Sequence, residues 1–159
     1  MKLAEALSLR ADEQRRVQEL KASAQSMARY QEGEEPAEDA IELVRDAQQS
    51  LDELERLVRQ INSTNAATRL ADGSTLTDAL ARRDVLRLRH GLLTAVAEAG
   101  AGQEKRGYTA IRQTRTELKF VSAVPVAELR RQADDLARQL RDLDAQIQQT
   151  DWSADLIES

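Results

Sequence analysis

Apolar residues recur every three or four positions along residues 126–147, and no polar residue breaks the series. The series is Val126, Leu129, Ala133, Leu136, Leu140, Leu143 and Ile147. This heptad spacing places one narrow apolar face along a helix, and such a face packs lengthwise against other helices. The pattern predicts a long helix over about residues 126–149.

Three further helices are predicted by apolar spacing together with the positions of Gly and Pro. Residues 2–30 contain neither Gly nor Pro and predict a first helix, whose apolar face is interrupted by Arg10, Glu13 and Gln14. A second helix is expected over about 36–63, because Pro is favoured in the first turn. Its predicted seam is Ala37, Ala40, Val44, Ala47, Leu51, Leu54, Val58 and Ile61.

The third helix, expected over 76–99, follows an Asp72-Gly73 turn signal and ends where Gly100 and Gly102 occur. Its predicted apolar face is Leu76, Leu80, Val85, Leu88, Leu92 and Val96. Residues 108–124 are richer in Thr, Val, Ile, Phe and Tyr, which predicts a small β-hairpin. Beyond the last helix, Trp152, Leu156 and Ile157 are expected to fold back as an apolar clasp.

These elements predict a mainly α protein, an antiparallel bundle of about four long helices with coiled-coil-like seams and a small hairpin near 108–124. A chain of 159 residues fits one domain, so residues 1–159 are expected to form a single helical-bundle domain. The interruption of the first helix by Arg10, Glu13 and Gln14 either lies at a solvated crossing or meets polar partners. It is also a candidate for setting the register between copies of the chain.

Composition limits the partners and the compartment. With 23 basic and 28 acidic residues the net charge is -5, which disfavours binding to nucleic acid. No cysteine is present, so no thiolate nucleophile and no zinc site built on sulfur is expected. Glu5 interrupts the apolar start of the chain, which argues against a signal peptide. We expect a cytoplasmic protein without a membrane span.

The sequence offers no catalytic triad, phosphate loop or metal-ligand cluster, so no catalytic residue, metal or cofactor is predicted. His90 is the single histidine. A lone histidine lacks the orienting group that catalysis requires, so we interpret it as a surface or packing residue.

Two polar clusters near the central turn are candidate ligand sites. A basic patch that could bind a phosphorylated ligand consists of Arg82, Arg83, Arg87 and Arg89, with Asp84 among them. Residues 31–60 hold ten acidic and three basic residues, and residues 76–119 hold five acidic and nine basic residues, so ion pairing between these segments is the favoured alternative.

The second cluster offers amides and hydroxyls to a small polar ligand, while the same residue types also terminate helices. It consists of Asn62, Thr64, Asn65 and Thr68. The candidate ligand-binding site drawn from the two clusters is made of Asn62, Asn65, Thr68, Arg82, Arg83 and Arg87.

The chain also resembles a known family. The blocks that carry the resemblance are MKLAEALSLRAD, YQEGEEPAED, INSTNAATRLADGSTLTDALARRDVLRLR and ELKFVSAVPVAELRRQADDLARQLRDLDAQIQQTDW. Over nearly its whole length the chain is similar to a small family of bacterial helical proteins often labelled septicolysin. The resemblance implies a bacterial cytoplasmic protein of mainly helical fold and unestablished function, and it supplies no catalytic residues.

Three functional hypotheses remain at this point. The leading one is a non-enzymatic helical protein that self-associates as a homo-oligomer, serving as a structural or protein-interaction module. The alternative is a small-ligand or anion-binding protein, with or without enzymatic activity, that uses the Asn, Thr and Arg residues around the central turn. The third is the pore-forming toxin that the family label suggests, which the charges at Arg112, Arg115, Glu117 and Lys119 in the expected hairpin disfavour.

Overall fold

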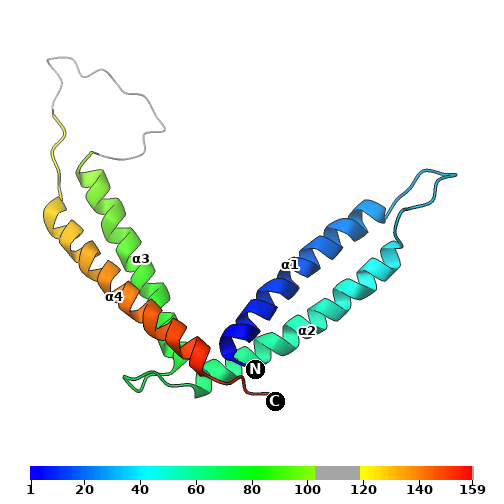
Figure 1. Ribbon diagram of the computed structural model, residues 1–159. Coiled ribbons are helices and arrows are strands. Elements are labelled where there is room, and N and C mark those ends of the chain that lie inside the picture. Colours follow the sequence, from blue (N-terminus) through cyan, green and yellow to red (C-terminus); the bar gives the residue numbers. More distant parts are fainter. Residues whose placement is uncertain (103–118, 159) are drawn as a thin grey trace. The chain divides into compact units, whose positions relative to one another are not determined.

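The computed structural model describes residues 1–102 and 119–158, and within them the chain forms four helices (Figure 1). The helices are α1 (Leu3–Met27), α2 (Ala40–Ala67), α3 (Leu76–Gly100) and α4 (Val126–Ser153). The predicted mainly α class with four long helices is confirmed, and the predicted helix ends differ from the observed ones by at most four residues.

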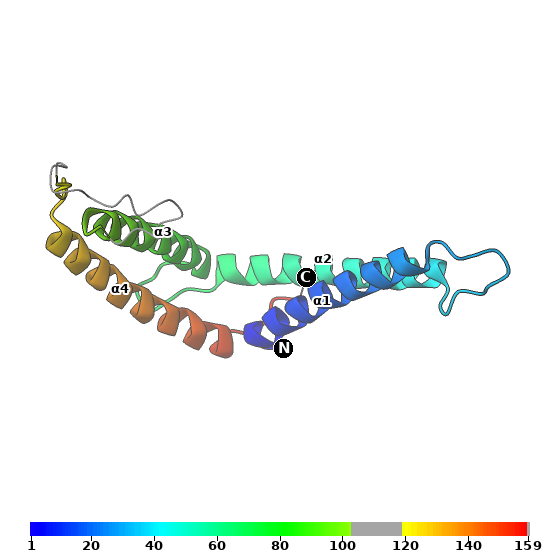
Figure 2. The same ribbon diagram turned by 90° about the horizontal axis from the view of Figure 1, so that it is seen from above.

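The chain divides into two compact units. The first unit is Met1–Thr77 with Ile147–Ser159, and the second unit is Asp78–Gln146. Helices α1 and α2 form an antiparallel pair in the first unit, and most of α3 and most of α4 form another in the second (Figures 1 and 2). That residues 1–159 act as a single domain stays a prediction.

In the first unit, α1 packs lengthwise on α2. The buried and half-buried residues of α1 repeat at three- and four-residue spacing and include Leu3, Ala6, Arg10, Glu13, Val17, Leu20, Ala24 and Met27. Arg10 and Glu13 therefore lie within the packed stripe. Among the described residues, Arg10 Nε and Glu13 Oε2 are buried without a hydrogen-bond partner. Their role in setting register between copies stays a prediction.

Helix α2 is shifted toward the C-terminus relative to the predicted range of 36–63. It begins at Ala40, after Pro36, because the Asp39 carboxylate caps it by accepting a hydrogen bond from Ile41 N at 2.8 Å. It continues to Ala67, and the buried Thr64 hydroxyl donates to Gln60 O at 2.8 Å, an arrangement compatible with a position inside a helix. Thr and Asn in this stretch were expected to end the helix.

A tight turn joins α2 to α3, as the Asp72-Gly73 signal predicted. Gly73 has φ +83°, a conformation that glycine adopts without strain. The Asp72 carboxylate accepts a hydrogen bond from Ser74 N at 2.9 Å, which closes an Asx turn. Leu76 N then donates to Thr68 O at 2.9 Å, and α3 begins at Leu76 as predicted.

Helix α4 presents its predicted face, whereas α3 presents only the ends of its own, where Leu76 is buried and Leu80 and Val96 are half-buried. All seven residues of the predicted α4 series are buried or half-buried. On α3, however, the predicted face includes Val85, Leu88 and Leu92, which are exposed. The buried and half-buried α3 residues of the second unit include Ala79, Arg83, Leu86, His90, Leu93, Ala97 and Gly100. Because Arg83 and His90 are polar, this packed series does not stand out as apolar in the sequence.

Gly100 closes the far end of the second unit because it leaves space for the chain that returns toward α4. A Cβ atom at this position would lie 2.6 Å from Val124 Cγ2 and 2.9 Å from Ser122 Oγ. Those separations are shorter than carbon and oxygen atoms tolerate, so a larger side chain would displace residues 122–124.

We expect Gly100→Ala to lower the free energy of unfolding by about 1–3 kcal/mol, because the added methyl group overpacks this contact. Gly91 is a matched control in the same helix, since a Cβ atom there meets nothing within 4 Å. Gly91→Ala is expected to raise the free energy of unfolding by up to about 1 kcal/mol, through higher helix propensity. Urea denaturation followed by circular dichroism measures both, and equal effects of the two substitutions would contradict the packing argument.

The small hairpin predicted near 108–124 is not seen. Residues 108–118 lie outside the described residues, and the described remainder, residues 119–124, is not in a strand. Ser122 instead forms a local turn in which its hydroxyl donates to Val124 O at 2.8 Å. Alternation of apolar and polar residues over so short a segment does not distinguish a strand from an extended connection.

Candidate functional site

The residues of the predicted ligand site fall into the two units. Asn62, Asn65 and Thr68 belong to the first unit, where Asn62 is exposed and the other two are half-buried. Thr68 ends α2, since its N–H donates to Thr64 O at 2.8 Å. Arg82, Arg83 and Arg87 belong to the second unit. Convergence of all six residues on one ligand stays a prediction.

Two arginines of the basic patch take part in ion pairs within the second unit. Arg87 lies 3.4 Å from Asp144 of α4, and Arg83 lies 3.2 Å from Asp84. The sequence predicted ion pairing, but with the acidic residues of the second helix. The described pairs of Arg83 and Arg87 are instead with Asp84 and Asp144.

The feature that the sequence analysis missed is an exposed apolar stripe along α3. Leu88 is 74% exposed, Leu92 is 63% exposed and Val85 is 46% exposed. Exposed or half-buried alanines extend the same spacing in both directions. The α3 stripe consists of Ala81, Val85, Leu88, Leu92, Ala95 and Ala99. The four- and three-residue spacing was visible in the sequence, but Val85, Leu88 and Leu92 were assigned to the core.

A contiguous stripe of this kind is unusual on a water-facing side of a helix. Polar and charged residues normally occupy the face that does not pack within the protein. Single exposed apolar residues need no explanation, whereas contiguous ones mark interaction surfaces. The α3 stripe is therefore the candidate functional surface.

The C-terminal segment ties the start of α1 to the end of α2 within the first unit. Leu3 N donates to Ala154 O at 3.0 Å, and Leu156 N donates to Met1 O at 2.9 Å. Ile157 N donates to the Thr64 hydroxyl at 2.9 Å. Of the three residues of the predicted apolar clasp only Leu156 is buried, while Ile157 is exposed and Trp152 is exposed on the last turn of α4.

Thr64 links α2 to the clasp, because its hydroxyl accepts from Ile157 and donates to Gln60 O. We expect Thr64→Val to lower the free energy of unfolding by about 1–3 kcal/mol and to loosen the C-terminal residues, since it leaves a backbone N–H without its acceptor. Thr64→Ser keeps the hydroxyl and is expected to behave more like the wild type. Urea denaturation and carboxypeptidase digestion measure the two effects, and equal loss in both variants would contradict the hydrogen-bond argument.

An ion pair reinforces the clasp. Lys2 Nζ lies 2.7 Å from Asp155 Oδ1. The hydrogen bond from Lys2, together with its positive charge, holds the pKa of Asp155 below its usual value of 3.8. A lowered carboxyl pKa stabilises the folded state above the unfolded pKa, and this contribution is lost as the pH falls through the folded pKa.

We therefore expect the stability difference between the wild type and Lys2→Met to be constant near neutral pH and to shrink below about pH 4. The difference is expected to be small because both side chains are exposed. Urea denaturation at a series of pH values measures it. A difference that grows toward acid pH would contradict the assigned direction.

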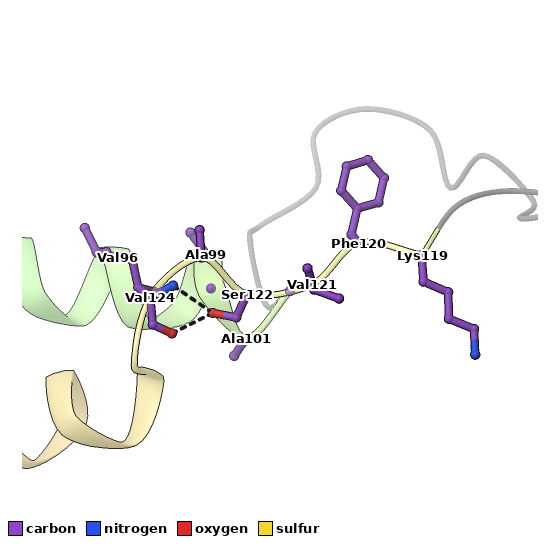
Figure 3. A pocket seen from close by; sticks show the side chains of 11 residues that line it. Val96, Ala99, Ala101, Lys119, Phe120, Val121, Ser122 and Val124 are labelled. Carbon is purple, nitrogen blue, oxygen red and sulfur yellow. Dashed lines mark hydrogen bonds between the residues drawn. The ribbon is translucent and has the colours of Figure 1, made fainter.

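A hollow of about 840 Å³ lies where α3 ends against residues 119–124 (Figure 3). The Phe120 ring and the Lys119 side chain extend to opposite sides of the chain. The Ser122 hydroxyl is engaged with the backbone of Val124. The described lining therefore lacks the converging polar groups that a specific small-molecule site contains.

Neither a metal cluster nor a membrane-spanning helix is found in the described part of the chain. Residues 1–102 and 119–158 hold no group of three or more His, Cys, Asp or Glu side chains placed to bind a metal ion. Within the same ranges, no helix combines the length and the apolar character needed to cross a membrane.

The family of unknown function DUF6847 matches residues 10–156. The chain belongs to this family. A solved structure is also similar, described as the crystal structure of a functionally unknown conserved protein from Corynebacterium diphtheriae. It is 36% identical, the match covers 99% of each chain, and the TM-score is 0.89. A comparison with curated proteins finds no match. These DUF6847 relationships establish the family and fold and leave the activity open.

Proposed function

We propose that this DUF6847 protein is a non-enzymatic, cytoplasmic interaction module that self-associates through an exposed apolar helix face. The observation that carries the proposal is the α3 stripe, in which Val85, Leu88 and Leu92 are exposed at heptad spacing. Covering one such side chain with apolar atoms contributes about 1.5–3 kcal/mol. A second copy of the chain carries the same apolar stripe, so two copies can cover each other's stripes without any other partner.

Self-association also fits the division of the chain into helix pairs. Heptad faces pack against other heptad faces, and a pair of helices leaves the outer side of each helix uncovered. On α3 that outer side is apolar. Homo-oligomers with a twofold axis use the same patch on both copies, which is the geometry a single continuous stripe supports.

Co-purification of two differently tagged copies tests the proposal. Both copies are expressed together, one tag is captured, and the bound fraction is examined for the other copy. We expect the second copy to be retained in a comparable amount. If the captured copy never retains the other at micromolar concentrations, the proposal fails. A Leu88→Glu pair of tagged copies serves as the control and is expected to lose retention.

The ligand-binding alternative has weaker support. Its six residues lie in two units, and Arg83 and Arg87 are engaged in ion pairs. Calorimetric titration with inorganic phosphate would test the arginines directly. The septicolysin label and the pore formation it suggests stand as a further proposal, tested by dye release from cholesterol-containing vesicles.

A further inference from the structure

We infer that two copies pair through α3 in parallel and in register, with the α3 stripe of one chain lying along the same stripe of the other. This inference rests on the proposed self-association and adds its geometry. The stripe belongs entirely to the second unit. At 3.6 residues per turn it lies on the side of α3 opposite Leu86, His90 and Leu93, which are buried or half-buried. A second helix therefore reaches it without displacing α4.

The order of side chains in the stripe fits a two-stranded coiled coil, and the charges beside it set the orientation. Stepping from Ala81 to Ala99, the intervals are four, three, four, three and four residues, as in the core of a two-stranded coiled coil. In this register Val85 occupies the a position and Leu88 the next d position. Among parallel coiled coils, a β-branched residue at a with leucine at d favours two strands over three or four.

Charges beside the stripe decide between parallel and antiparallel pairing. Asp84 and Glu98 flank it on one side, and Arg82 and Arg89 flank it on the other. In a parallel pair, each residue on the first side meets the residue five positions later on the other side of the second helix. Asp84 then faces the second copy's Arg89, and the twofold axis makes this contact twice.

Antiparallel pairing would bring like charges together. Full overlap of two antiparallel stripes sets Ala81 against the second copy's Ala99. Asp84 would then lie near the second copy's Glu98, and Arg89 would lie near its own counterpart. Like charges in such positions are destabilising. In addition, none of the ion pairs between described residues includes Arg89, so its guanidinium is available to a second copy.

Cysteine cross-linking tests the orientation. The chain has no native cysteine, so any disulfide forms between introduced thiols. Val85→Cys and Ala95→Cys are prepared separately and oxidised. In the parallel pair each introduced cysteine faces the same cysteine of the second copy, so each variant alone is expected to form a disulfide-linked dimer. In the antiparallel pair the two thiols of a Val85→Cys dimer would be about ten residues apart along the helix, about 15 Å, and only a mixture of the variants would cross-link. Ile41→Cys, exposed on α2, controls for random collision.

The outcomes distinguish a wrong orientation from a failure of self-association itself. Cross-linking of each variant alone, well above the Ile41→Cys level, supports the inference. Cross-linking only in the mixture overturns the parallel orientation and leaves self-association intact, as does a dimeric mass without any cross-link. A monomeric mass overturns both proposals.

A second variant tests the charge argument independently. Asp84→Asn is expected to raise the dimer dissociation constant by about 2–10-fold in the parallel pair, because it removes two exposed charge contacts. In an antiparallel pair the same substitution relieves repulsion from Glu98 and would lower the dissociation constant. A lower dissociation constant therefore overturns the inference.

Discussion

Replacing Leu57 by alanine is expected to lower the free energy of unfolding by about 2–5 kcal/mol, the range for leucine removed from a packed core. Leu57 is 0% exposed on α2. The fully buried large side chains identified in the described part of the chain are few, namely Leu3, Leu57, Ile61, Leu76 and Thr64. With so few, each accounts for a substantial share of the stability.

Leu51 supplies the matched control on the same helix. Leu51 and Val44 were predicted in the seam of this helix, but they are 47% and 44% exposed. Leu51→Ala is therefore expected to change the free energy of unfolding by less than about 1 kcal/mol. Both variants are measured by urea denaturation followed by circular dichroism. Similar losses for Leu51→Ala and Leu57→Ala would contradict the assignment of the core to the Leu57 face of α2.

Replacing Leu88 by glutamate is expected to abolish self-association at micromolar concentration. A symmetric dimer loses two buried leucines, each worth about 1.5–3 kcal/mol, and must bury two carboxylates in their place. The dissociation constant is therefore expected to rise by at least about 100-fold. Sedimentation velocity over a concentration series measures it, while circular dichroism is expected to stay unchanged because Leu88 is 74% exposed.

Ile41→Glu on α2 provides the comparison, because Ile41 is 67% exposed and lies outside the stripe. Its dissociation constant is expected to match that of the wild type. If Ile41→Glu dissociates the protein and Leu88→Glu does not, the interface lies on the first unit and the assignment to α3 is wrong.

Heptad spacing predicted the packed face of α4, because its seven apolar positions are uninterrupted and all are buried or half-buried. The start and end of α2 were less predictable. Pro36 and Asp39 are both acceptable starting signals, and the hydrogen bond from Ile41 N to Asp39 selects the second. Thr64 resembles a helix terminator in sequence, yet its contacts with Gln60 and Ile157 fix it inside a helix. Such contacts depend on distant residues and have no local signature.

Helix α3 shows why the candidate surface escaped prediction. It carries two series at heptad spacing, and the more apolar one, with Val85, Leu88 and Leu92, was taken for the core. The packed series contains Arg83 and His90. Arg83 is tolerated there because it pairs with Asp84 and approaches Asp144 of α4. The sequence of one helix does not show a pairing partner on another helix. The series with Val85, Leu88 and Leu92 was therefore predicted as core in place of the series with Arg83 and His90.

The mass of the wild-type protein in solution tests the central claim most directly, and static light scattering at micromolar concentration measures it. We expect twice the 17.8 kDa of one chain, and a return to the mass of one chain for Leu88→Glu. A wild-type mass of one chain at every concentration would contradict self-association through α3.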